Sequence, residues 1–222
     1  MRDRAKTLEQ VYAVQWNCCA AWALEKRKLS MGPTGADAPR SSTEDASLSL
    51  AARYAPILMF DEAEPFLPSA VGVTVFHDAA DSPSFPRPIT REFTPPWETA
   101  IEYAIWWDWD IGHLYELEHA WSYLDADGRL VWAEASWHGS YSAMSLARGR
   151  LSAEGDHPVL YPQPGKHAFA PEPICLERVI HFVVKDAAHA AGEGGVLVKE
   201  QYAHEIDLQE GDHERAAAYL RQ

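Results

Sequence analysis

One short segment of the chain concentrates the side chains that could bind a cation or a polar ligand. Residues 98–137 contain nine acidic residues but only one basic residue, Arg129. Six of the nine tryptophans lie in the same segment. Carboxylates packed this densely repel one another unless water, protons or a divalent cation offsets their charge. We therefore place the function in this segment and regard the rest of the chain mainly as scaffold.

The spacing of the acids predicts a divalent-cation site. In extended chain, residues two apart face the same side, and Ile111-Gly112 can turn the chain between two acidic pairs. Oxygen ligands suit Ca²⁺, Mg²⁺ or Mn²⁺ better than Zn²⁺, and one histidine is tolerated. The competing interpretation is a solvated acidic loop beside a half-buried sheet. The predicted metal ligands are Asp108, Asp110, His113, Glu116 and Glu118.

Two further histidines are candidates for contact with a ligand. His138 and His167 stand next to Gly139 and Gly165, so we expect turns that place both imidazoles at strand ends, in ligand-binding or structural hydrogen-bonding roles. His119 follows Glu118 on a strand and should point to the opposite face, as a packed or hydrogen-bonded residue. The predicted ligand-binding residues are the two turn histidines and the aromatic rim: His138, His167, Trp107 and Trp109.

Catalysis is the alternative use of the same residues. A glycosidase would need two carboxyl groups at a fixed separation with aromatic platforms for sugar rings, but large aromatics in a sandwich more often form core. A metal-assisted hydrolase of glycans or esters would use a metal-activated water, with His138 or a pocket carboxylate as base. The sequence contains no nucleophile elbow, Gly-rich phosphate loop or HExxH motif.

Composition limits the class of protein and its partners. A formal net charge of −14 argues against nucleic acid and against electrostatic attachment to anionic lipid. The three cysteines, two of them adjacent, do not form a disulfide framework, which favours a reduced, cytoplasmic setting over secretion. No apolar run is long enough to predict a transmembrane helix, so we expect a soluble protein.

Patterning predicts a mainly β protein with a helix at each end. We expect an amphipathic N-terminal helix within 1–28, a Gly/Pro/Ser-rich linker at 29–47 and a β domain over 48–222. Short apolar runs separated by turn signals indicate an antiparallel β-sandwich, and Asp127-Gly128 predicts a hairpin. The final DHERAAAYLRQ predicts a short helix, and the N-terminal helix is a candidate homodimer contact. Predicted strands include 53–60, 71–76, 100–109, 157–162, 178–184 and 194–202, and 77–97 is expected to be an irregular loop.

Four short segments resemble a known family. GHLYELEH at 112–119 resembles the GHRHDWEH heptapeptide region of the necrosis- and ethylene-inducing peptide 1-like proteins, and the wider order also resembles the Vps62-like sandwich domains. The other segments are RYAPILMFDEAEPFLPS, EASWHGSY and HPVLYPQPGKHAFAP. The resemblance implies a central β-sandwich with an acidic pocket that holds a divalent cation. By position it implies His113, Glu116 and Glu118 as ligands, with Asp108 or Asp110 as the upstream acid.

The departures from that family limit what is carried over. Leu114, Tyr115 and Leu117 replace an arginine, a histidine and a tryptophan of the heptapeptide, and the typical secretion signal and paired cysteines are missing. We therefore expect the scaffold and the cation site to be retained, but not the toxicity. The resulting hypothesis is a metal-binding domain whose acidic, aromatic-rimmed pocket holds a small polar ligand, such as a sugar or a lipid headgroup.

Overall fold

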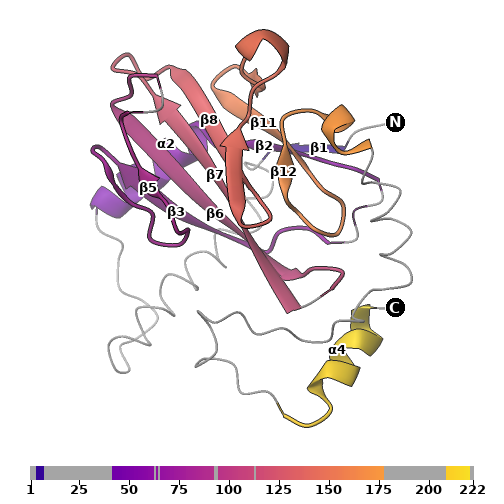
Figure 1. The fold of residues 1–222 in the computed structure, drawn as a ribbon. Helices are drawn as coiled ribbons and strands as arrows, with labels where there is room; N and C mark the ends of the chain where they lie inside the picture. The colour runs from indigo at the N-terminus through magenta and orange to yellow at the C-terminus, as the bar shows by residue number, and fades with distance from the viewer. Residues whose placement is uncertain are drawn as a thin grey trace.

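The fold is described from a computed structural model, which covers residues 4–7, 42–62, 64, 66–92, 95–112, 114–177 and 209–220. The main elements (Figure 1) are β1 (Arg4–Thr7), α2 (Ser42–Arg53), β2 (Ile57–Phe60), β3 (Ala70–Phe76), β4 (Ala80–Asp81), β5 (Pro88–Ile89), β6 (Thr99–Trp109), β7 (Leu114–Leu124), β8 (Leu130–Trp137), β9 (Ser140–Ala143), β10 (Ala153–Glu154), β11 (His157–Pro162), β12 (Phe169–Ala170) and α4 (Asp212–Leu220). Two short 3₁₀ helices span Ala147–Gly149 and Pro173–Cys175.

Two five-stranded sheets form a β-sandwich, as predicted. One sheet has the order β3-β6-β7-β8-β9, and the other has the order β1-β2-β11-β10 with β12 paired to β11. All pairs are antiparallel except β2 and β11, which run parallel through Val159↔Ile57 and Leu160↔Leu58. The predicted antiparallel sandwich is thus confirmed, with one parallel pair that was not predicted. This pair joins segments about a hundred residues apart in the chain.

The core lies between the two sheets. Side chains that alternate along β6, such as Ile101, Tyr103 and Ile105, point inward and are fully buried. They pack in one cluster with Leu58 of β2 and Leu160 of β11. Burial of apolar surface on this scale, at about 25 cal/mol per Å², is the main force that holds the sheets together. Because successive side chains of a strand point to opposite faces, every second residue of a long strand faces this core.

The predicted hairpin at Asp127-Gly128 joins β7 to β8. Gly128 has φ +73°, in the left-handed region that glycine adopts without steric cost. The Asp125 carboxylate accepts hydrogen bonds from the backbone N–H groups of Asp127 and Arg129, each at 2.9 Å. These bonds close the turn locally, so the DADG sequence specifies both the loop and the register of the strands that follow.

A proline-rich loop covers the outer face of the β3–β9 sheet. Residues 77–97 were expected to be irregular, and the described residues of this stretch are so apart from the two-residue strands β4 and β5. Ile89 and Trp97 of this loop are buried against Trp121 and Tyr123 of β7 in a second apolar cluster. The sheet is therefore covered on both faces, by the other sheet on one side and by this loop on the other.

The N-terminal part differs from the prediction. Residues 42–53 form α2, so the linker predicted at 29–47 ends no later than residue 41. The SSTED sequence has the Ser-x-x-Glu spacing of a capping box, which explains a helix here. Pro56 disfavours helix in the residue before it, so the strand predicted from residue 53 begins only at Ile57.

Of the elements predicted near the two ends of the chain, only some lie within the described residues. Arg4–Thr7 form β1, paired with β2, where the N-terminal helix 1–28 was predicted. The rest of that helix, with the dimer contact proposed for it, and the strands predicted at 178–184 and 194–202 lie outside the described residues. The C-terminal helix is confirmed as α4, which lies near the Trp109 end of β6 in Figure 1.

Candidate functional site

A pocket lies where β8 parts from β7. The registered pairs between these strands run from Ala120↔Ala135 to Leu124↔Leu130, whereas β7 already begins at Leu114. Beside the first half of β7 the chain leaves a pocket of about 340 Å³, which is within the range of small-molecule sites. Its walls come from the covering loop, β7, the β8–β9 turn and the loop before β12. The lining residues are Ser84, Phe85, Pro86, Glu116, Leu117, Glu118, His119, His138, Gly139 and Lys166.

Two of the predicted metal ligands, Glu116 and Glu118, line this pocket together. They pair with Trp107 and Ile105 of β6, so both carboxylates lie on the same face of β7, as predicted. Glu116 is half-buried, whereas Glu118 is 4% exposed. Ser136 donates its hydroxyl proton to Glu118 Oε2. The pocket therefore has one more accessible and one enclosed carboxylate.

His138 reaches the same pocket from the β8–β9 turn. The prediction of a turn at this histidine is confirmed: His138 has φ +46° and Gly139 has φ +80°. His138 Nε2 lies 2.7 Å from Oε1 of Gln163, a residue that is 4% exposed. Because an amide oxygen only accepts, the imidazole donates from Nε2, which in its neutral form leaves Nδ1 as an acceptor. A left-handed backbone at a non-glycine residue is strained and is often found at functional sites.

Asp110 is paired with Lys166. Asp110 follows β6 and is fully buried; its Oδ2 accepts from Lys166 Nζ, and its Oδ1 accepts from Gly112 N. Lys166 also lines the pocket, so it links the buried acid to the two glutamates. The predicted ligand Asp110 is therefore next to the pocket, but its charge is balanced by a lysine from a distant part of the chain.

Asp108 lies elsewhere. Its side chain is exposed, and its Oδ1 accepts hydrogen bonds from Ser69 Oγ at 2.9 Å and from Trp106 Nε1 at 3.0 Å. Asp108 and Asp110 thus do not converge as the sequence analysis expected. Asp108 remains within regular β6 and faces the start of β3, whereas Asp110 lies beyond the end of β6.

Trp107 and His167 form a buried stack. Their ring centroids are 4.5 Å apart with an angle of 9° between the planes, and both residues are 0% exposed. His167 has φ +64°, and its Nε2 lies 3.2 Å from Glu64 Oε1. The predicted turn at His167 is present, but here the two rings support the loop that carries Lys166. Neither ring lines the pocket.

Trp109, the fourth residue predicted for ligand contact, meets the C-terminal helix. Its ring centroid is 4.8 Å from that of Tyr219 on α4. Trp109 is half-buried by this contact and does not line the pocket. The aromatic wall of the pocket comes instead from Phe85 in the covering loop, which the sequence analysis did not single out.

The described residues do not by themselves gather a set of metal ligands. Within the described ranges no group of three or more His, Cys, Asp or Glu side chains is placed to hold a metal ion. Asp110 is bonded to Lys166, Asp108 faces Ser69, and Glu118 is bonded to Ser136. His113, the imidazole ligand predicted for this site, lies outside the described residues. The divalent cation therefore stays a prediction.

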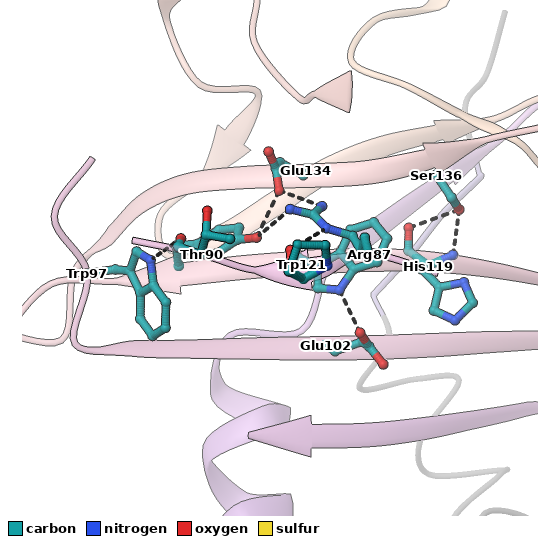
Figure 2. A network of polar contacts seen from close by, with 10 residues as sticks. Arg87, Thr90, Trp97, Glu102, His119, Trp121, Glu134 and Ser136 are labelled. Atoms are coloured by element: carbon teal, nitrogen blue, oxygen red, sulfur yellow. Dashed lines mark hydrogen bonds and ion pairs between the residues drawn. The ribbon is translucent and has the colours of Figure 1, made fainter. Parts of the chain in front are cut away.

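A second polar network lies on the outer face of the sheet (Figure 2) and shares Ser84 and His119 with the lining of the pocket. Arg87 of the covering loop donates from Nη1 to Glu134 Oε2 at 2.7 Å, and the Tyr123 hydroxyl donates to the same oxygen at 2.8 Å. Burial, followed by the nearby Glu134 charge, raises the pKa of Tyr123 well above its usual value. The Arg87 guanidinium also lies over the rings of Trp121 and Tyr141, at 4.6 and 3.6 Å from their centroids.

His119 belongs to this network, as its predicted orientation implies. It is 1% exposed, and its Nε2 lies 2.9 Å from Ser84 Oγ, which donates its proton to Glu102 Oε1 at 2.9 Å. Because a hydroxyl has one proton, His119 donates to Ser84 rather than accepting from it. Trp121 Nε1 donates to the other Glu102 oxygen at 2.7 Å. Ser84 therefore fastens the covering loop to the sheet and is not activated as a nucleophile by His119.

Two basic residues from outside the acidic segment offset part of its charge. Residues 98–137 contain one basic residue, but Arg87 and Lys166 reach Glu134 and Asp110 from outside that segment. The sequence does indicate that such partners exist, because Glu102 and Glu134 lie within otherwise apolar strands and buried carboxylates need hydrogen-bonding or charged partners. Which residues would be those partners depends on the fold.

Comparisons with known proteins add matches of fold only. No family model matches the chain, and no curated protein matches it. A solved structure described as NLPPya in complex with glucosamine matches with a TM-score of 0.38 and 18% identity, over 64% of this chain and 74% of that chain. NLPPya in complex with mannosamine matches with a TM-score of 0.38 and 19% identity over the same shares.

A third structure, described as a toxin fold for microbial attack and plant defense, matches with a TM-score of 0.37 and 19% identity, over 60% of this chain and 71% of that chain. Among the described residues, no helix is long and apolar enough to cross a membrane. The strand pairing described above establishes the mainly β sandwich of this chain.

Proposed function

We propose that the pocket beside the first half of β7 binds a small polyhydroxyl ligand with a cationic group, of which an amino sugar is the simplest example. The observation that carries this proposal is the position of Glu116 and Glu118 on one face of β7, in a pocket large enough for a monosaccharide. A carboxylate that accepts from an ammonium or hydroxyl group makes a short, charge-assisted hydrogen bond. Two such acceptors favour a ligand rich in donors.

The other walls suit the same ligand. Phe85 provides an aromatic surface, and sugar rings commonly pack their C–H faces against such surfaces. His138 offers an acceptor at Nδ1, because its Nε2 is bonded to Gln163. The net charge of −14 also raises the local concentration of cationic ligands around the protein. A lipid headgroup with the same donors belongs to the same chemical class.

Calorimetric titration with glucosamine and mannosamine, with glucose and mannose as neutral counterparts, tests the proposal. We expect Glu116→Gln to weaken binding of the amino sugars about tenfold, because the more accessible charged acceptor is lost. Glu154→Gln is the matched control, since Glu154 is exposed on β10 in the other sheet. The proposal fails if neither amino sugar binds, or if both variants bind them as tightly as the parent.

A divalent cation that bridges the glutamates to ligand hydroxyls is the second form of this proposal. The shared face of Glu116 and Glu118 favours it, and His113 is a further ligand predicted from the sequence. Calcium, magnesium, manganese and zinc are titrated into protein that has been treated with a chelator. A stoichiometric site that is lost in Glu118→Ala supports the bridging form, whereas sugar binding in the presence of the chelator supports direct contact.

A further inference from the structure

Lys166 brings a fixed positive charge into the acidic pocket. Its side chain is 27% exposed, and its ammonium is paired with Asp110, whose side chain is 0% exposed. The same lysine lines the pocket beside Glu116 and Glu118. A buried carboxylate requires charge compensation, and here a covalently attached ammonium provides it.

Backbone hydrogen bonds fix the loop that carries Lys166. Gln163 O accepts hydrogen bonds from Lys166 N at 3.1 Å and from His167 N at 2.7 Å. Gly165 O accepts from Ile111 N at 3.0 Å, which joins the lysine loop to the residues around Asp110. Gly165 N donates to Glu64 Oε2 at 2.9 Å. The lysine loop and the end of β6 are therefore joined by backbone contacts as well as by the ion pair.

The immediate surroundings leave little room for a second cation at Asp110. Both of its oxygens accept hydrogen bonds, Oδ2 from Lys166 and Oδ1 from Gly112 N. A Cβ atom on Gly112 would lie 3.3 Å from Asp110 Oδ1 and 3.8 Å from Lys166 Nζ, so the backbone closes over the pair. A metal ion that used Asp110 would have to displace the ammonium.

We infer that Lys166 is the resident cation of this pocket: its ammonium supplies the positive charge that the sequence resemblance assigns to a divalent metal ion. This inference rests on the proposed function and specifies its metal-free form. Lys166 balances Asp110, while Glu116 and Glu118 provide the acceptors for the ligand. The pocket then needs no metal ion either to fold or to bind an amino sugar.

Replacing the charge while keeping the length of the side chain tests the inference. Lys166→Met leaves Asp110 buried without its ammonium, and we expect the Tm to fall by about 6–20 °C, the shift for losing one partner of a buried ion pair in a chain of this size. Millimolar Ca²⁺ or Mn²⁺ should restore at least half of that loss, because an exogenous cation can then approach Asp110. The response should disappear in Lys166→Met/Asp110→Asn, which has no charge to balance. The Tm of Lys166→Arg should be insensitive to these ions.

The parent protein provides an arm that does not depend on whether the variants fold. We expect no stoichiometric metal after purification and no change of Tm in EDTA. Arg129→Met is the matched control for loss of an ion-paired base, since the Arg129–Asp127 pair is exposed. A parent protein that contains bound metal or loses stability in EDTA overturns the inference, as does a folded Lys166→Met protein whose Tm does not respond to cations.

Titration of glucosamine into the parent protein in EDTA separates this inference from the proposed function. Binding that persists in EDTA supports both. Absence of amino-sugar binding, with and without metal, removes the proposed function, and the cation responses of Tm still decide the role of Lys166. Binding that appears only after a divalent ion is added overturns the role of Lys166 and leaves the bridging form of the proposed function.

Discussion

Arg87 Nη1 lies 2.7 Å from Glu134 Oε2, with side chains that are 6% and 11% exposed. The pair joins the covering loop to β8 at a distance of 47 residues along the chain. An ion pair this deeply buried stabilises the folded state no more than a well-packed apolar pair would, because burial of both charges costs free energy. Removal of one partner, however, leaves an uncompensated charge. The covering loop and the sheet are therefore electrostatically dependent on each other.

Loss of Arg87 should destabilise the fold strongly. We expect Arg87→Met to reduce the free energy of unfolding by about 3–5 kcal/mol, because Glu134 would remain buried without its cation. Urea denaturation measures this change. Arg129→Met, at an exposed pair, should cost less than about 1 kcal/mol. If Arg87→Met/Glu134→Gln is no more stable than Arg87→Met alone, the uncompensated charge is not the cause.

Tyr123 should make the stability fall at alkaline pH. Its pKa is raised in the folded state by burial and by Glu134, whereas the unfolded chain has the ordinary value near 10.0. Above that pH the unfolded state releases a proton that the folded state retains. The free energy of unfolding is therefore unaffected by Tyr123 ionisation below pH 10 and decreases as the pH rises above it. Tyr123→Phe should flatten this decline by up to about 1.4 kcal/mol per pH unit.

Urea denaturation of both proteins across the alkaline range checks the effect of Tyr123. The variant should also be less stable near neutral pH, by about 1 kcal/mol, because its hydrogen bond to Glu134 is lost. Tyr219→Phe, on the partly exposed helix α4, is the control and should leave the slope unchanged. Equal slopes for the parent and Tyr123→Phe would show that Tyr123 ionises equally in the folded and unfolded states.

Two glycines with similar backbone angles separate strain from steric clash. Gly165 has φ +70°, and a Cβ atom there would lie 2.5 Å from Ile111 Cγ2. Gly155 has φ +60° with no atom within 4 Å of such a Cβ. We expect Gly155→Ala to cost about 1–2 kcal/mol for its left-handed backbone, and Gly165→Ala to cost about 1–3 kcal/mol more for overpacking. Equal costs in urea denaturation would mean that the loop around Gly165 moves easily.

The Ser84 hydroxyl should contribute to stability through two buried groups. Ser84→Ala leaves Glu102 with one donor fewer and removes the acceptor of the His119 Nε2–H. We expect a loss of about 2–3 kcal/mol in the free energy of unfolding. Ser140→Ala is the control, since the exposed Ser140 hydroxyl donates to Trp137 O, and its loss should cost about 0.5 kcal/mol or less. Similar losses for both variants would contradict the fastening role of Ser84.

Local patterns predicted the elements whose contacts are close in sequence. The Asp127-Gly128 hairpin, the alternation that pairs Glu116 and Glu118 on one face, and the turn at His138 all depend on a few neighbouring residues. The helix α2 was missed although SSTED has a capping-box spacing, because a Gly/Pro-rich composition before it suggested a longer linker.

The partners of the acidic residues could not be predicted, because they come from distant segments. Lys166 is 56 residues from Asp110, and Arg87 is 47 residues from Glu134. The parallel pairing of β2 with β11 that helps to place the Lys166 loop is also long-range. Trp107 was predicted at the rim, but a large aromatic on the inner face of β6 is buried whenever the opposite sheet covers it.

The dependence of the covering loop on the sheet also limits how this sequence can diverge. Surface loops usually tolerate insertions and deletions, since few contacts fix their length. Here Ser84 and Arg87 must reach Glu102 on β6 and Glu134 on β8, at fixed positions on the two strands that flank β7. Related chains should therefore change loop length outside the Ser84–Arg87 stretch, and a replacement of Arg87 should be accompanied by a neutral residue at position 134.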